Sequence, residues 1–418
     1  MVFYYLCTLN MRKRLIISFF LCLSMMMQAQ TTWCDSVSAR LDSVLGDELL
    51  ERSQMGMMVW DLTDDVLLYK YQPRQLLRTA STMKALTAVV ALDVLGGNYE
   101  LKTRLYHTGT ISNGVLNGNL ICVGGMDPLF DSIDMKAFAA AVKEKGITTI
   151  KGRIVIDCSL KDVEKWGEGW CWDDDNPTLS PLLINGKPSF TAQFVKEMRN
   201  MKINVTTVSP LPGTLPKDAK LLCIRKHSID QVLERMMKES DNLFAESLYY
   251  QIAASTGKRP ATAKEAKKVE MDFFKKIGLD GENYRLADGS GLSLYNYLTP
   301  ECETMVMRYA WQHQTIYNHL LPALPIAGVD GTLKKRMIGT YAQGNVKAKT
   351  GSVAAVSALT GYLTASNGHL LCFSIMNQGV RRMAEGRQFQ DRICTVLCSP
   401  PDMELNLLWK QLDSLYNK

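Results

Sequence analysis

Residues 79–97 read TASTMKALTAVVALDVLGG and place a serine and a lysine where a helix is predicted to begin. The apolar run and the two closing glycines predict a helix over about residues 82–95. Because residues three apart share one face of a helix, Ser81 and Lys84 would point the same way. A lysine whose pKa is depressed by burial can accept a serine proton, so this pair is a candidate nucleophile and base.

A Ser-x-x-Lys pattern alone is weak evidence, since it arises by chance roughly once or twice in a chain of this composition. A second copy, at Ser255 and Lys258, is followed by Arg259-Pro260. Glycine and proline end a helix there and leave both side chains at an exposed boundary. We therefore interpret the second copy as having no function.

Two later elements could complete a site around Ser81. Ser240-Asp241-Asn242 places a hydroxyl and a carboxamide on one short turn, although Ser240 could equally be a helix N-cap. Lys349-Thr350-Gly351-Ser352 lies on a predicted strand, where Lys349 and Gly351 face one way and Thr350 the other. The glycine would let a ligand approach the backbone, whereas a structural interpretation is an edge strand guarded by a charge.

The flanking patterns predict an antiparallel sheet with helices packed against it, built from both ends of the chain. Residues 56–71 alternate as a hairpin. Three further strands and an amphipathic segment are predicted near the other end: 345–352, 357–364, 369–377 and 381–394. Residues 101–223 show short strand-like runs and few helical periods, and helical patterns return at 229–254 and 263–277.

Composition narrows the class of protein. The chain has 418 residues, of which 46% are hydrophobic and 22% charged, enough for two domains. The net charge of +6 is scattered, which argues against a nucleic-acid partner and allows at most peripheral membrane association. The cysteines lack CxxC spacing and the five histidines lack HExxH, so we predict neither a metal nor another cofactor.

The N-terminus has the three parts of a secretory signal: basic residues 11–14, an apolar run over 15–27 and a polar end at 28–30. We predict that residues 1–29 are removed and that the protein is exported to the periplasm or cell envelope. The alternative, a single anchor helix, is disfavoured because the apolar run is too short to cross ~30 Å of hydrocarbon.

Ser-x-x-Lys, Ser-x-Asn and Lys-Thr-Gly, in that order, are the signature of active-site serine penicillin-recognising enzymes. The chain resembles the D-alanyl-D-alanine carboxypeptidase/endopeptidase family of class C low-molecular-mass penicillin-binding proteins. Further stretches that carry the resemblance are GNLICVGGMDP (118–128), GWCWDD (169–174), ESDNLFAESL (239–248), DGSGLS (288–293), LPIAGVDGTLKKR (324–336) and KAKTGSVAAVSALTGYL (347–363).

The resemblance implies an α+β fold of the penicillin-binding, β-lactamase-like transpeptidase type. Residues 31–100 and 225–418 would form a discontinuous serine DD-peptidase domain, and residues 101–224 an inserted, mostly β subdomain. Peptidoglycan stem peptides ending in D-Ala-D-Ala would be the substrates, and β-lactam antibiotics the inhibitors. The spacing between Ser81 and Ser240 is shorter than in the family's long members, so we expect a reduced insertion.

The resemblance also implies roles for individual residues. Ser81 would attack the carbonyl between two D-alanines, with Lys84 as general base. Ser240 would relay a proton to the leaving amine, Asn242 would bind the substrate amide and Lys349 would supply positive charge.

Further residues would hold the substrate. Thr350, next to Gly351, would bind the substrate carboxylate, and the N–H groups of Ser81 and Ser352 would form the oxyanion hole. In the inserted region, Asp127 is a predicted contact for a diaminopimelate amine.

Two other functions share these elements. A β-lactamase of the same fold would need a water-activating base, and no Glu-x-x-Leu-Asn segment follows Ser240. A non-catalytic wall-peptide-binding protein would have little reason to retain all three elements.

Overall fold

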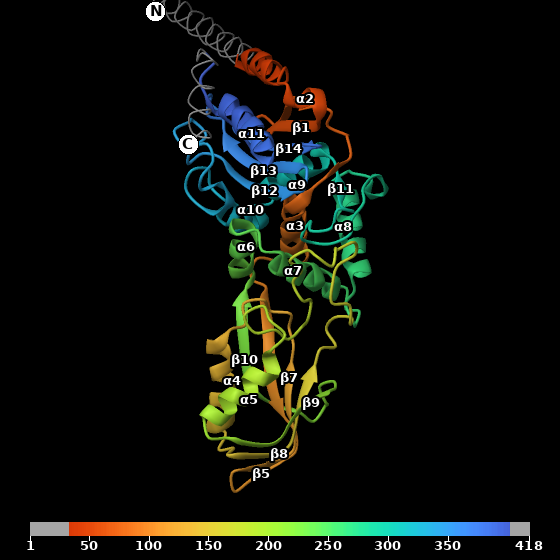
Figure 1. Cartoon of the computed structure of the whole chain (residues 1–418), viewed down its shortest axis with the longest axis vertical. Coiled ribbons are helices and arrows are strands. Elements are labelled where there is room, and N and C mark those ends of the chain that lie inside the picture. Colours follow the sequence, from red (N-terminus) through yellow and green to blue (C-terminus); the bar gives the residue numbers. More distant parts are fainter. Residues whose placement is uncertain (1–32, 402–418) are drawn as a thin grey trace, which may run out of the picture.

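The computed structural model describes residues 33–401, so the predicted signal segment 1–29 lies outside the described residues. The molecule is elongated and has two lobes, one holding both ends of the described range and the other built from about residues 100–228 (Figure 1). No helix within residues 33–401 combines the length and apolar character needed to span a membrane.

The first lobe is centred on a five-stranded antiparallel sheet with the order β12-β13-β14-β1-β2. The hairpin consists of β1 (Gln54–Asp61) and β2 (Val66–Tyr71), and the three later strands are β12 (Lys347–Val353), β13 (Val356–Thr364) and β14 (Leu370–Gln378). β1 pairs with β14, which joins the two ends of the chain in one sheet. The predicted hairpin, the three strands and their common sheet are confirmed.

Helices cover both faces of this sheet because neighbouring strand residues point to opposite sides. On β14, Phe373 belongs to the core shared with α11 (Met383–Cys398), whereas Cys372 belongs to the core shared with α9 (Pro300–Gln312). Next to α9 lies α3 (Met83–Leu95), whose residues from Met83 to Leu92 are all buried. The sequence predicted α3 to within a residue, and Gly96, with a φ of 80°, ends it.

The helical region predicted over 229–254 is divided into two helices, α6 (Ile229–Lys238) and α7 (Asn242–Ser255). The division falls at Ser240, whose φ of 62° is incompatible with a right-handed helix. α8 (Ala263–Lys276) follows as predicted. Other elements of this lobe are a helix that covers residues 33–44 of the described range, α2 (Leu49–Arg52), α10 (Gln314–Ala323), the paired β3 (Leu77–Arg78) and β11 (Tyr297–Leu298), and the short 3-10 helices Ala80–Thr82, Gly281–Asn283 and Gly331–Leu333.

The second lobe contains a mixed seven-stranded sheet with the order β10-β4-β7-β8-β6-β5, in which β9 also pairs with β8. Its strands are β4 (Glu100–His107), β5 (Thr110–Ser112), β6 (Val115–Asn117), β7 (Leu120–Val123), β8 (Thr149–Asp157), β9 (Asn204–Pro212) and β10 (Lys220–Ser228). The polypeptide enters this lobe after α3 and returns to the first lobe at α6 (Figure 1).

Two helices of the second lobe were missed by the sequence analysis: α4 (Ser132–Glu144) and α5 (Phe190–Asn200). They pack together through Phe138 and Phe194, whose ring centroids are 6.2 Å apart. Each helix buries only four or five residues at helical spacing, and this short pattern is diluted by the strand-like runs around it.

Candidate active site

Ser81 lies in the 3-10 turn Ala80–Thr82 that leads directly into α3. Ala80 has a φ of 44°, a conformation that is unfavourable for a residue with a Cβ. The DGSGLS loop packs directly against this turn. The approach is so close that a Cβ at Gly291 would lie 1.8 Å from the carbonyl oxygen of Ala80. The hydroxyl of Thr82 donates to the buried carboxyl group of Glu303. Packing therefore fixes the position of the serine at the helix entrance.

Lys84 is completely buried, and its Nζ lies 2.9 Å from Ser81 Oγ. The same nitrogen lies 2.7 Å from Asn242 Oδ1 and 2.7 Å from the carbonyl oxygen of Ser290. A neutral amine has two N–H donors and one lone pair, and the two carbonyl oxygens can only accept. The lone pair of neutral Lys84 is therefore left for the hydroxyl of Ser81, the arrangement that a general base requires.

Burial lowers the pKa of Lys84 to about 8, although the charges of Asp288, Glu246 and Asp241 partly oppose this shift. At neutral to mildly alkaline pH a substantial fraction of the amine is thus unprotonated. Glu246 is also completely buried, and its Oε1 accepts hydrogen bonds from the N–H groups of Gly289 and Ser290. It supports the loop whose carbonyl oxygen binds Lys84.

The sequence analysis missed Glu246 because it lies inside an ordinary helical pattern. Its only signal was its place in the quoted stretch ESDNLFAESL. Burial raises its pKa to about 8, and the charge of Asp288 acts in the same direction.

A second serine and lysine pair lies opposite the first. Lys349 Nζ lies 2.9 Å from Ser240 Oγ and also donates to the carbonyl oxygen of Thr350 at 2.8 Å. Asp241, whose side chain accepts from the N–H of Leu243, is the N-cap of α7. The interpretation of Ser240 as an N-cap is therefore wrong, and its hydroxyl is directed at Lys349 instead.

The ionisation of Lys349 differs from the simple expectation of a fixed positive charge. Burial, and then the charge of Lys84, hold the pKa of Lys349 well below its usual value. A carboxylate bound next to it would raise this pKa again, because an opposite charge favours the charged form.

Gly351 has a structural role that the sequence did not indicate. A Cβ at this position would lie 2.6 Å from the carbonyl oxygen of Thr79 and 3.1 Å from the N–H nitrogen of Thr82. The glycine lets strand β12 pack directly against the turn that carries Ser81. It serves the close approach of two segments of this chain.

A cleft of about 690 Å³ opens at these residues. It brings together Ser81, Ser240, Thr350 and Ser352 from three separate parts of the chain. Thr350 Oγ1 donates to Thr332 Oγ1 at 2.8 Å. The remaining lining residues include several cations that the sequence analysis did not single out: Lys334, Lys335, Arg336 and Arg387. Arg336 is already paired with Asp391 at 2.5 Å, and the other three cations suit the cleft to a substrate that carries a carboxylate.

Asp127 does not line this cleft. Its side chain is buried, with Oδ2 2.8 Å from Nδ1 of His227 and Oδ1 accepting from the N–H of Leu129. The hydrogen bond that the imidazole donates to Asp127 raises the pKa of His227. The predicted contact with a substrate amine thus falls on a carboxylate that already has partners within the protein.

The second Ser-x-x-Lys copy is not assembled into a site. Ser255 Oγ donates to the carbonyl oxygen of Ile252, and Lys258 pairs with Glu265 at 3.5 Å. No hydrogen bond joins Ser255 to Lys258 within the described part of the chain, in contrast to Ser81 and Lys84.

Within residues 33–401, one group of side chains has the spacing of metal ligands: Asp61, Asp64 and His369. Asp61 accepts from the N–H groups of Thr63 and Asp64, and its other oxygen lies 2.7 Å from His369 Nδ1. These contacts close the turn between β1 and β2, and none of the three residues lines the cleft.

Comparisons with known proteins agree with this geometry. D-alanyl-D-alanine carboxypeptidase DacB of Haemophilus influenzae is 28% identical to the chain, over 79% of the chain and 86% of that protein. A D-alanyl-D-alanine carboxypeptidase of Actinomadura sp. (strain R39) is 26% identical, over 81% of the chain and 80% of that protein.

A crystal structure of penicillin binding protein 4 (dacB) from Haemophilus influenzae, complexed with a novel β-lactam, superposes with a TM-score of 0.71 at 25% identity, covering 84% of the chain and 99% of that structure. This likeness confirms the expected α+β penicillin-binding fold. The sequence model of the D-Ala-D-Ala carboxypeptidase 3 (S13) family matches residues 37–185 and 183–398. The chain therefore belongs to this family of serine-type D-Ala-D-Ala carboxypeptidases.

Proposed function

We propose that this protein hydrolyses the D-Ala-D-Ala bond at the end of peptidoglycan stem peptides through an acyl-enzyme on Ser81. The observation that carries the proposal is the environment of Lys84: a buried amine 2.9 Å from Ser81 Oγ whose two other neighbours are hydrogen-bond acceptors. Family membership and the cationic cleft support the same assignment.

In the proposed first step, Lys84 Nζ takes the hydroxyl proton of Ser81 while Oγ bonds to the carbonyl carbon of the penultimate D-Ala. The N–H groups of Ser81 and Ser352 would stabilise the negative charge on the carbonyl oxygen, a contribution of about 3–4 kcal/mol per donor in serine hydrolases. Asn242 would hydrogen-bond the substrate amide, and Thr350 would hold the terminal carboxylate.

The C–N bond then breaks, and the leaving amine receives a proton through Ser240, whose hydroxyl lies 2.9 Å from Lys349. Terminal D-Ala departs, and an ester remains on Ser81. Water hydrolyses this ester, which restores the serine hydroxyl and releases a peptide shortened by one residue. A β-lactam would acylate Ser81 by the same attack on its ring carbonyl.

We extend the proposal to DD-endopeptidase activity on crosslinked stems. A crosslink presents the same D-Ala carbonyl with a longer leaving group. A second hollow of about 870 Å³, lined by Asn242, Arg235 and Asp241 among others, would give such a leaving group room.

The proposed organisation follows the family. Residues 31–100 and 225–418 would form the catalytic domain and residues 101–224 an inserted subdomain. Removal of residues 1–29 on export would place the enzyme in the periplasm or cell envelope, where its substrate lies.

The test is acylation by a fluorescent penicillin, with the labelled peptide identified by mass spectrometry in the wild-type protein and in Ser81→Ala. Release of D-Ala from an N-acylated Lys-D-Ala-D-Ala peptide is measured in parallel. We expect label on Ser81 and D-Ala release, both lost in Ser81→Ala. Absence of an adduct on Ser81 would refute the proposal. Rapid turnover of penicillin without D-Ala release would instead indicate a β-lactamase, and binding of the peptide without either reaction would indicate a wall-peptide-binding protein.

A further inference from the structure

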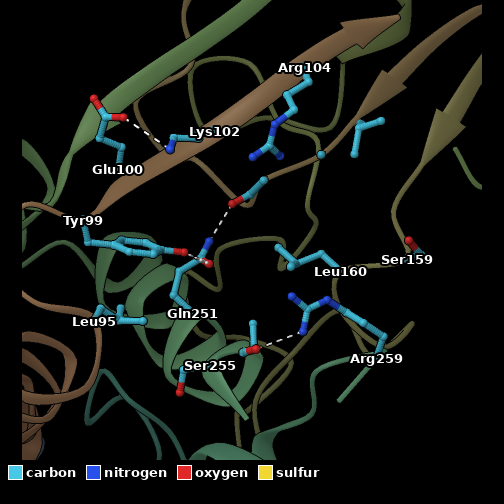
Figure 2. A pocket seen from close by; sticks show the side chains of 14 residues that line it. Leu95, Tyr99, Glu100, Lys102, Arg104, Ser159, Leu160, Gln251, Ser255 and Arg259 are labelled. Atoms are coloured by element: carbon cyan, nitrogen blue, oxygen red, sulfur yellow. Dashed lines mark hydrogen bonds and ion pairs between the residues drawn. The ribbon is translucent and has the colours of Figure 1, made fainter. Parts of the chain in front are cut away.

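A separate cavity, of about 440 Å³, lies at the junction of the two lobes, where the ends of α3 and α7 meet β4 and β7 (Figure 2). α3 starts beside the catalytic serine and ends at Leu95, which lines this cavity. α7 likewise starts at Asn242 and ends at Ser255 in the cavity wall. At 1.5 Å per residue, the length of α3 separates the cavity from Ser81 by about 20 Å.

Positive charge predominates in the cavity. Its lining includes three cations, Lys102, Arg104 and Arg259, and a single carboxylate, Glu100. That carboxylate is already engaged, since Glu100 lies 3.4 Å from Lys102 Nζ and 3.0 Å from Lys226 Nζ. No acidic side chain in the lining therefore balances the two arginines.

The two guanidinium groups have few partners of their own. The backbone of Arg104 is paired within the sheet, but its guanidinium has no hydrogen bond or ion pair with any residue of the described range 33–401. Arg259 donates only to backbone carbonyl oxygens, of Ala254 at 3.0 Å and of Lys258 at 2.7 Å. Figure 2 shows the guanidinium of Arg104 reaching the cavity from β4 and that of Arg259 reaching it from another wall, with Leu160 between them in this view. A guanidinium has five N–H donors, so each of them retains donors for a ligand.

The alternation of β4 explains why these cations face the cavity. Leu101, Thr103 and Leu105 are buried, whereas the intervening Lys102 and Arg104 are half-buried. Leu105 belongs to the core under α4 and α5, so the intervening residues point to the opposite face of the sheet. The alternation of side chains along β4 thus places Lys102 and Arg104 on the face that lines the cavity.

The remaining walls of the cavity contain both hydrogen-bonded polar side chains and apolar side chains. Tyr99 donates to Gln251 Oε1 at 2.8 Å, and Gln251 Nε2 donates to the carbonyl oxygen of Gly125 at 2.6 Å. Leu95 and Leu160 supply apolar surface between these polar groups (Figure 2). A ligand that fits this lining has an oxyanion group and small apolar groups close to it.

We propose that this cavity is a second, non-catalytic binding site for a carboxylate of a peptidoglycan stem peptide, held between Arg104 and Arg259. The choice of ligand rests on the proposed function, which makes stem peptides the substrate. Such peptides combine free carboxylates with alanine methyl groups, and guanidinium groups bind carboxylates through paired hydrogen bonds. Binding here would anchor one stem while another reaches Ser81.

Binding at the second site is measured after Ser81 has been blocked by penicillin, so that the catalytic cleft cannot contribute. The probe is the N-acetylated tripeptide L-Ala-γ-D-Glu-L-Lys, titrated by calorimetry into the acylated full chain. Its analogue with both carboxylates converted to amides, and inorganic phosphate, are titrated in parallel. If Ser81 proves not to be acylated, Ser81→Ala is compared with the double variant Ser81→Ala, Arg104→Ala, and only the binding that depends on Arg104 is assigned to the cavity.

We expect the tripeptide to bind and its diamide to bind at least about tenfold more weakly, because hydrogen bonds between charged groups are lost. Arg104→Ala should weaken binding by about tenfold, and Arg104→Lys by less. The matched control is Arg153→Ala, which removes an exposed arginine of the same lobe that does not line the cavity. It should leave the affinity unchanged.

Absence of binding to the blocked protein, equal affinity for the diamide, or unchanged affinity in Arg104→Ala would overturn the proposal. Phosphate binding as tightly as the tripeptide would also overturn it and would assign the cavity to a phosphate-bearing ligand. D-Ala release is assayed separately, so the two proposals can fail independently. Hydrolysis without tripeptide binding would contradict only the proposed second binding site. Tripeptide binding without hydrolysis would contradict only the proposed enzymatic activity.

Discussion

Nζ of Lys84 lies 2.9 Å from Oγ of Ser81, and the surrounding acceptors leave that nitrogen one free direction when it is neutral. The catalytic competence of the pair therefore depends on the loss of a proton from a buried amine. Ser255 and Lys258 have the same spacing in sequence but no such contact, since each bonds to a different neighbour. Burial and partners distinguish the two copies.

The rate of acylation of Ser81 by penicillin should rise with pH and level off above about 8, the pKa to which burial lowers Lys84. Below that pH the protonated amine cannot accept the serine proton, so the rate should fall about tenfold per pH unit. Stopped-flow measurement of the second-order rate constant from pH 5.5 to 9.5 gives this profile. Lys84→Ala should lose a factor of about 10²–10⁴. A profile independent of pH across 6 to 9 would contradict the role of Lys84 as base.

Glu246→Gln should make the free energy of unfolding less dependent on pH. The pKa of Glu246 is raised from 4.5 to about 8 in the folded protein, so folding binds a proton in this window and stability falls as pH rises through it. Glutamine retains the acceptor oxygen without this loss. From pH 5 to pH 8 the free energy of unfolding of the wild type should therefore fall by more than about 1 kcal/mol relative to that of the variant.

Urea unfolding at several pH values measures that difference. Glu234→Gln, at an exposed position on α6, is the control and should show no such trend. Because the charge of Glu246 also raises the pKa of Lys84, Glu246→Gln should move the inflection of the acylation profile to lower pH. An inflection at higher pH would mean that Glu246 does not act on Lys84 through its charge.

Ser240→Gly should reduce D-Ala release strongly while leaving the fold at least as stable. At a φ of 62° serine carries a cost of about 1–2 kcal/mol that glycine avoids, offset in part by the greater entropy of unfolded glycine. We expect a melting temperature equal to or above that of the wild type. Lys202→Gly is the matched control, since Lys202 has a φ of 61° on the surface and no role in the cleft. Full activity in Ser240→Gly would exclude a function for its hydroxyl.

Gly351→Ala should impair both acylation and stability. Its Cβ would meet the backbone of Thr79 at 2.6 Å, and backbone atoms cannot rotate out of the way. The expected destabilisation is about 1–3 kcal/mol, as for other overpacked sites. Thermal unfolding and penicillin labelling measure the two effects. Ser352→Ala, one residue further along the strand and exposed, should retain wild-type stability. Normal labelling in Gly351→Ala would show that the contact between strand and turn is unimportant.

The sequence by itself determined several elements of the first lobe and the order of its motifs, whereas α9, α10 and the short pair β3 and β11 were not predicted. Alternating residues predicted the hairpin of β1 and β2, strand-like runs with short separators predicted the three later strands, and the apolar run closed by glycine predicted α3. These signals are local, because side-chain period and helix-ending residues act within a few positions of the chain. Helices α4 and α5 were not predicted from the sequence because each buries only a few residues at helical spacing.

Only the tertiary structure decided how the motifs act together. The depressed pKa of Lys84 comes from burial by segments distant in sequence, the φ of Ser240 from the junction of two helices, and the need for Gly351 from a turn some 270 positions away. The burial of Asp127 beside His227 likewise depends on a neighbouring strand. The electrostatic environment and the steric contacts of a residue depend on which segments are neighbours in space. The spacing of residues within a motif does not specify those neighbours.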